Sequence, residues 1–95
     1  MNPENRFYVE LLEKLKSYCV YRERCEWEVE LKLNSLGASE TRIEQIVGEL
    51  KKQNFLDNKR FAAAFVSGKF RMKKWGKNKI KAELRSKKLD TETID

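Results

Sequence analysis

Histidine is absent from the 95-residue sequence, proline occurs once, and cysteine occurs only as Cys19 and Cys25. Without histidine, the common zinc ligand sets and the mechanisms that need an imidazole base are excluded. Two cysteines separated by five residues, in a sequence without histidine, are typical of reduced thiols in the cytoplasm. We interpret both as structural. No apolar run approaches the roughly 20 residues of a membrane span, so we expect neither such a span nor a signal peptide.

Other catalytic patterns are missing as well. The sequence has no glycine-rich phosphate loop and no serine in a nucleophile-elbow pattern. Glu26, Glu28 and Glu30 would point in different directions on a helix, so they do not form a carboxylate pair. Asp57 is better interpreted as a helix cap than as a catalytic acid. We therefore predict a non-enzymatic protein with no catalytic residues, no cofactor and no metal.

Positive charge is concentrated in one segment. Residues 69–88 hold ten basic side chains and one acidic side chain, for a net charge of +9, whereas residues 1–68 are neutral and residues 89–95 carry −3. Apolar residues alternate with the basic ones, which indicates a folded segment rather than a loose tail. This asymmetry predicts a polyanionic or acidic partner, although a merely solvated helix face is the simpler alternative.

The spacing of apolar residues predicts helices in the first half of the chain. A stripe at i, i+3, i+4 and i+7 predicts a helix over about 4–20, and a second stripe ends at Gly37, a natural left-handed terminator. Ser39 is suited to cap a third helix. The stripe residues are Tyr8, Leu11, Leu12 and Leu15, then Val29, Leu33 and Leu36, then Ile43, Ile46, Val47 and Leu50.

The second half predicts two further helices and the start of another. Asp57 or Asn58 caps a fourth helix that runs to about Lys74, and Gly76 interrupts the pattern before a fifth helix. Ile94 marks the beginning of a sixth. The residues assigned to packing are Phe61, Phe65, Val66, Ile80 and Leu84, and Met72 is placed on the same apolar side of the fourth helix as Phe61 and Phe65.

The two halves repeat. A constant offset of 51 residues aligns Val29 with Ile80 and Leu33 with Leu84. The first helices correspond as well if the connections that follow them differ by two residues, which pairs Tyr8 with Phe61 and Leu12 with Phe65. The predicted fold is all-α, with tandem three-helix repeats at 1–53 and 54–95. The second repeat is cut off at the start of its third helix, and we expect the natural protein to continue past Asp95.

Three stretches resemble the RecX family, bacterial regulators of the RecA recombinase. Residues 22–33 match the pattern R-E-x-S-x-x-E-L-x-x-K-L, residues 56–66 match L-D-D-x-R-F-A-x-x-F-V, and residues 74–84 match G-x-G-P-x-x-I-x-x-E-L. The departures include Cys25 for serine, Asn58 for aspartate and Lys77 for proline. Cys25 is expected to be the poorer cap because a thiol is a weak acceptor.

The resemblance implies a function. Proteins of this family lie in the groove of the RecA filament on DNA and inhibit its recombinase, ATPase and co-protease activities. For this chain it implies a role in recombination, DNA repair and the SOS response. The implied partners are the RecA filament and single- or double-stranded DNA contacted through phosphates, and we expect a cytoplasmic monomer.

The candidate residues for binding DNA or the RecA filament lie around the fourth and fifth predicted helices. They are Arg71, Lys74, Lys77, Lys79, Lys81, Arg85, Lys88 and Trp75. Lys69 and Lys73 fall nearer the apolar side and are expected to snorkel. Trp75 either stacks on an unpaired base or closes the core, and Trp27 is interpreted as a core or interface residue.

Two alternatives stay open. A three-helix unit with a basic helix is also typical of helix-turn-helix modules that bind DNA without a RecA partner. Against this, the basic residues are mostly lysines on two helices, with no obvious base-reading set at a helix N-terminus. In the second alternative, this fragment is only a folded scaffold, and a final repeat outside it carries the binding.

Overall fold

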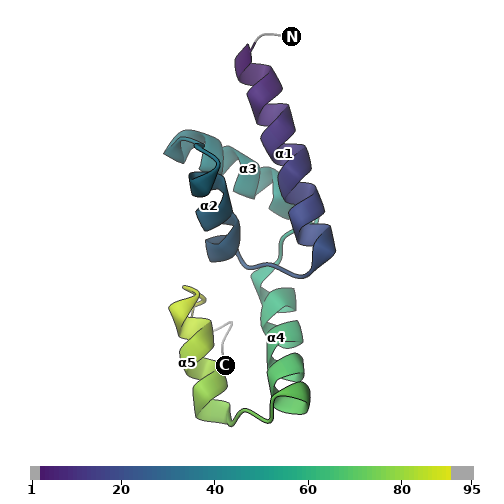
Figure 1. The fold of residues 1–95 in the computed structure, drawn as a ribbon, viewed down its shortest axis with the longest axis vertical. Coiled ribbons are helices and arrows are strands. Elements are labelled where there is room, and N and C mark those ends of the chain that lie inside the picture. The colour runs from purple at the N-terminus through teal and green to yellow at the C-terminus, as the bar shows by residue number, and fades with distance from the viewer. Residues whose placement is uncertain (1–2, 91–95) are drawn as a thin grey trace.

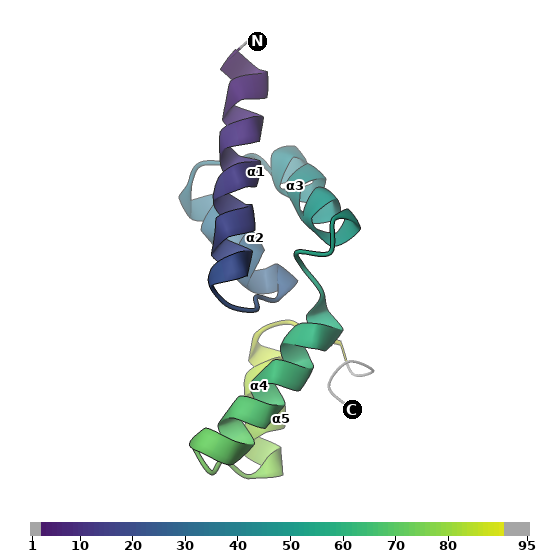
Figure 2. The ribbon, with the colours of Figure 1, turned by 90° about the vertical axis from the view of Figure 1, so that its right-hand side faces the viewer.

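The computed structural model describes residues 3–90, and its regular structure there is entirely helical, as predicted. Five helices follow one another in this range: α1 (Pro3–Tyr21), α2 (Glu26–Ser35), α3 (Glu40–Lys52), α4 (Asn58–Met72) and α5 (Lys77–Ser86) (Figure 1). The described chain is elongated, with extents of 50 × 22 × 21 Å. Helices α1–α3 form one unit, and α4 and α5 form a second unit below it on the long axis (Figure 2). The predicted sixth helix at Ile94 lies outside the described residues.

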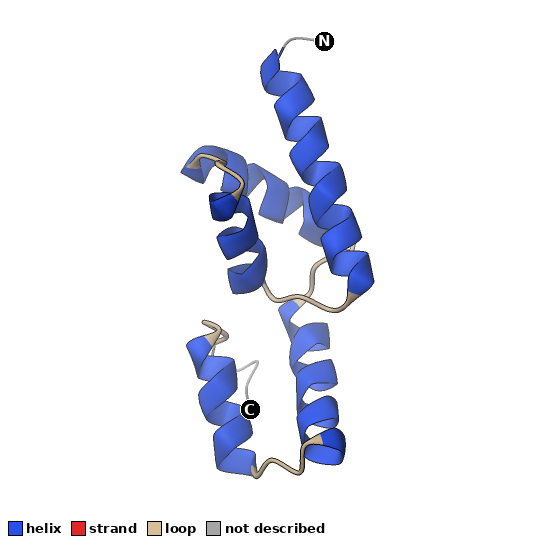
Figure 3. Cartoon of the chain, viewed as in Figure 1, coloured by secondary structure: helices blue, strands red, loops and turns tan. Residues whose placement is uncertain are grey.

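The first unit forms because each of its helices supplies an apolar stripe to one core. The fully buried side chains come from all three helices and are Leu15, Val29, Leu33, Ile46 and Leu50. The predicted boundaries are confirmed: Gly37 has φ +86°, and Ser39 Oγ accepts a hydrogen bond from the Arg42 N–H at 3.2 Å. Helix α3 therefore packs across both α1 and α2, closing the unit (Figure 3).

The second unit packs α4 against α5. Its buried residues include Phe61 on α4 and, on or just after α5, Ile80, Leu84 and Leu89. The predicted packing of Val66 is wrong, because its side chain is 39% exposed, and Met72, on the predicted apolar side, is 80% exposed. Met72 is the last residue of α4, and Val66 is rotated about 100° along the helix from Phe65. Helix α4 also ends two residues before the predicted Lys74, which has φ +59°.

The register of the repeat differs from the prediction at the first helices. The connections at 22–25 and 73–76 have the same length, so the predicted two-residue difference is wrong. Leu11 and Leu15 are the deeply buried residues of α1, at 4% and 0% exposure, and Phe61 at 3% has the same place on α4. Burial therefore pairs Leu11 with Phe61, an offset of 50 residues that is close to the 51 of the second helices.

The start of α2 belongs to both units. Cys25 is fully buried and packs with Phe61 and Leu84 in the core of the second unit, and Trp27 packs against the same core. The Glu26 N–H donates to Asn58 Oδ1 at 2.9 Å, which links the first turns of α2 and α4. The two units are therefore joined by shared core residues and not only by the chain between them.

Glu28 strengthens the cap at Cys25. The Cys25 backbone N–H donates to Glu28 Oε1 at 3.1 Å, the side-chain half of a capping box. The Cys25 thiol lies 3.9 Å from the carbonyl oxygen of Lys87 and points toward the second unit. The weak acceptor at this position is therefore offset by the carboxylate three residues later.

Candidate nucleic-acid interface

Trp75 lies at the corner between α4 and α5. Its ring is half-buried, packs against the core of the second unit, and meets Phe65 edge-on with ring centroids 6.4 Å apart. The backbone N–H of Trp75 donates to the backbone carbonyl oxygen of Lys69 at 3.1 Å, and the preceding Lys74 adopts a left-handed backbone conformation. These backbone features turn the chain so that the indole closes the open end of the α4–α5 pair.

Two ammonium groups flank the Trp75 ring. Lys79 Nζ lies 4.3 Å and Lys69 Nζ lies 4.8 Å from its centroid, and Lys69 Nζ is also 5.4 Å from the centroid of Phe65. Cations at this distance are attracted to the electron-rich ring face. The predicted snorkelling of Lys69 is thus confirmed, whereas Lys73 is exposed. The surroundings of Trp75 favour its interpretation as a core-closing residue.

The predicted basic residues are mostly on the surface. Those with exposed side chains are Arg71, Lys74, Lys77, Lys79, Arg85 and Lys88. Within residues 3–90, none of these six forms an ion pair with an acidic side chain. Lys81 is half-buried and does have an interaction partner. The six exposed side chains therefore keep their positive charge without a neutralising neighbour, as a phosphate-binding surface requires.

Sequence reasoning missed a group of cations at the junction of the units. Arg22 precedes α2 and Lys87 follows α5, yet both approach the same carboxylate oxygen of Glu28, at 3.1 Å and 4.0 Å. Lys87 Nζ also lies 5.6 Å from the centroid of the Trp27 ring. Arg22 of the first unit and Lys87 of the second therefore lie side by side at the junction, around the one carboxylate of Glu28.

Other kinds of site find no support in residues 3–90. No group of three or more acidic, cysteine or histidine side chains within that range is arranged to hold a metal ion. Over the same range, no helix is both long and apolar enough to cross a membrane. Cys19 and Cys25 are buried free thiols.

Comparisons with known proteins agree with one another. The family model described as RecX, second three-helix domain, matches residues 57–95. The regulatory protein RecX of Bacillus licheniformis is 35% identical over 81 residues, which cover 85% of this chain and 31% of that protein. The chain thus spans about a third of the length of this curated relative.

Two solved structures share the fold. A crystal structure of regulatory protein RecX superposes with a TM-score of 0.86 at 25% identity, covering 93% of this chain and 43% of that one. The crystal structure of RecX from Lactobacillus salivarius gives a TM-score of 0.84 at 26% identity, covering 92% and 56% of the two chains. The tandem arrangement of helical units is therefore shared with both.

Proposed function

Because the chain belongs to the RecX family of regulatory proteins, we propose that it binds the RecA–DNA filament as a non-enzymatic, cytoplasmic monomer. Binding inhibits the recombinase, ATPase and co-protease activities of RecA. The observation that carries this proposal is the exposed basic surface of the second unit, beside a first unit (residues 1–53) whose nine basic and ten acidic side chains give a net charge of −1.

Phosphates are the natural ligands of this surface. Lysine and arginine side chains that neutralise phosphates release condensed counterions, which gives strong, salt-dependent affinity with little base discrimination. The predominance of lysine suits this role, since an ammonium is a point charge rather than a bidentate base reader. The more neutral first unit is then available for a protein surface of the filament.

The test compares RecA ATPase activity on single-stranded DNA with and without this chain. A variant in which Arg71, Lys74, Lys81 and Arg85 are replaced by glutamate should lose inhibition. A matched control reverses the same number of charges at exposed positions outside this surface, namely Arg6, Lys14, Lys52 and Lys59. Circular dichroism verifies that both variants fold.

Equal inhibition by the two variants would show that the basic surface of α4 and α5 is not the filament contact. A salt titration with DNA alone and then with the RecA–DNA filament separates the proposal from a free-standing DNA-binding module. Tight and sequence-selective binding to DNA alone would favour that module.

A further inference from the structure

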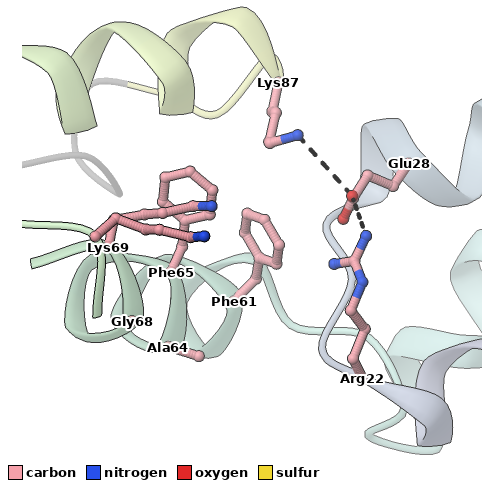
Figure 4. A pocket seen from close by; sticks show the side chains of 9 residues that line it. Arg22, Glu28, Phe61, Ala64, Phe65, Gly68, Lys69 and Lys87 are labelled. Atoms are coloured by element: carbon pink, nitrogen blue, oxygen red, sulfur yellow. Dashed lines mark hydrogen bonds and ion pairs between the residues drawn. The ribbon is translucent and has the colours of Figure 1, made fainter. Parts of the chain in front are cut away.

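A groove of about 430 Å³ opens at the junction of the two units, between α4, the end of α5 and the start of α2 (Figure 4). Its apolar floor is formed by Phe61, Phe65 and Gly68, and its charged rim includes Arg22, Lys73 and Lys87. We call this feature the junction groove. Its volume falls within the roughly 300–1,000 Å³ typical of small-ligand sites.

The floor of the junction groove offers an aromatic surface. The ring centroids of Phe61 and Phe65 lie 5.7 Å apart, and both rings point into the space between α4 and Lys87 (Figure 4). Phe61 is almost fully buried and supports Phe65, which is half-buried and keeps part of its ring accessible. Gly68 leaves the neighbouring stretch of α4 without a side chain, and a Cβ there would meet nothing within 4 Å.

The rim carries an excess of positive charge. Four cations line the groove, because Lys69 joins the three named above, and Glu28 is the one acidic side chain among the lining residues. Both carboxylate oxygens of Glu28 already have partners within the protein. One accepts a hydrogen bond from the Cys25 backbone N–H, and the other forms ion pairs with Arg22 and Lys87. The groove therefore keeps a net charge of about +3 next to an apolar floor.

We propose that the junction groove binds one nucleotide unit, with its base against Phe65 and its phosphate between the rim cations. The proposal rests on the proposed function and deepens it, because it makes single-stranded nucleic acid the preferred ligand. A base stacked on an aromatic side chain contributes roughly 1–3 kcal/mol in single-strand binders. A duplex keeps the faces of its bases stacked inside, and a peptide of acidic residues alone supplies negative charge without a planar apolar group.

Gly68 permits a test that removes no existing contact. Gly68→Leu adds a side chain to the floor and so fills the groove, while Gly48→Leu adds the same side chain to an exposed glycine of α3; at both positions an added Cβ would meet nothing within 4 Å. Both replacements also raise helix propensity, so neither is expected to unfold its helix. Lys73→Gln, compared with Lys52→Gln, tests the rim in the same way.

Binding is measured by fluorescence anisotropy with labelled oligo(dT) and with a duplex of equal phosphate count, in the absence of RecA. We expect the single strand to bind at least about fivefold more tightly than the duplex, the lower bound from stacking one base. Gly68→Leu should reduce this preference to less than about twofold, and Gly48→Leu should preserve it. Lys73→Gln should weaken binding and reduce its salt dependence, and Lys52→Gln should do neither.

Competition distinguishes the sources of the nucleotide. Displacement of oligo(dT) by dTMP at similar concentrations of nucleotide would assign the groove to free nucleotides, and retention of oligo(dT) would assign it to a strand. Equal affinity for single strand and duplex, a Gly68→Leu variant that behaves like wild type, or displacement by polyglutamate as effective as by unlabelled oligo(dT) would overturn the proposal. Since no RecA is present, these outcomes are independent of the ATPase test of the proposed function.

Discussion

Arg60 and Glu23 join the two units by an ion pair, in which Arg60 Nε donates to Glu23 Oε2 at 2.6 Å across 37 residues of sequence. The same guanidinium donates to the side-chain and backbone oxygens of Asn54, each at 3.1 Å. One side chain of α4 thus holds the connection that follows α1 and the connection that follows α3. This arrangement helps to set the orientation of the second unit on the first.

Arg60→Ala should lower the free energy of unfolding by about 1 kcal/mol. Hydrogen bonds to charged groups contribute about 1.5–3 kcal/mol, but both side chains are about one-third exposed, so solvent screening reduces the value. Urea denaturation measures the loss, with the exposed neighbour Lys59→Ala as the control. A double-mutant cycle with Glu23→Gln should give a coupling of about 0.5 kcal/mol, and a coupling of zero would show that the pair contributes nothing.

The cap of α4 predicts a selective effect at Asp57. Its Oδ1 accepts from the backbone N–H groups of Lys59 and Arg60, at 2.9 Å and 3.1 Å. Asp57→Ala should therefore cost about 1 kcal/mol of stability, whereas Asp57→Asn keeps an acceptor and should cost much less. Thermal denaturation followed by circular dichroism compares them. Equal losses for the two variants would mean that the carboxylate charge, rather than the cap, is what matters.

The thiols predict how stability changes at alkaline pH. Burial raises the pKa of Cys19 and of Cys25 above the ordinary value of 9.0. The folded chain therefore keeps these protons to a higher pH than the unfolded chain. Their contribution to stability is complete below about pH 9 and decreases as the pH rises through the raised values.

Urea denaturation between pH 8 and pH 10 checks this expectation, with Cys19→Ala/Cys25→Ala as the reference. The wild-type free energy of unfolding should fall more steeply with pH than that of the double variant. In native protein at pH 8, both thiols should also react slowly with a thiol reagent and become reactive on unfolding. Parallel pH profiles for the two proteins would contradict the assignment.

Local patterns explain why the helices were predictable. A helix face repeats every 3.6 residues, and a cap acts within one turn, so Ser39, Gly37 and Asp57 are identifiable without knowledge of distant contacts. Met72 is exposed because it is the last residue of α4, and Val66 is exposed because it lies on another face of that helix than Phe65. Apolar character alone therefore overestimated the core.

The same distinction applies to the candidate site. Local charge density identified the basic segment 69–88, and its surface exposure followed from helix periodicity. The convergence of Arg22 and Lys87 on Glu28 required the packing of two units, because Lys87 is 59 residues from Glu28. Glu28 also lies within the stretch that resembles the family pattern, but nothing in the sequence pairs it with Lys87.

The two interpretations of Trp75 predict different behaviour for Trp75→Leu, which keeps apolar volume but removes the ring. If Trp75 closes the core, stability should fall by about 1–2 kcal/mol, because the contact with Phe65 and the flanking ammonium groups is lost. The affinity for oligo(dT), measured under conditions where the variant is folded, should then stay within about twofold of wild type. If an unpaired base stacks on the ring, affinity should fall at least about fivefold. Trp27→Leu serves as the comparison, and we expect the first pattern for both tryptophans, since each already packs against the core of the second unit.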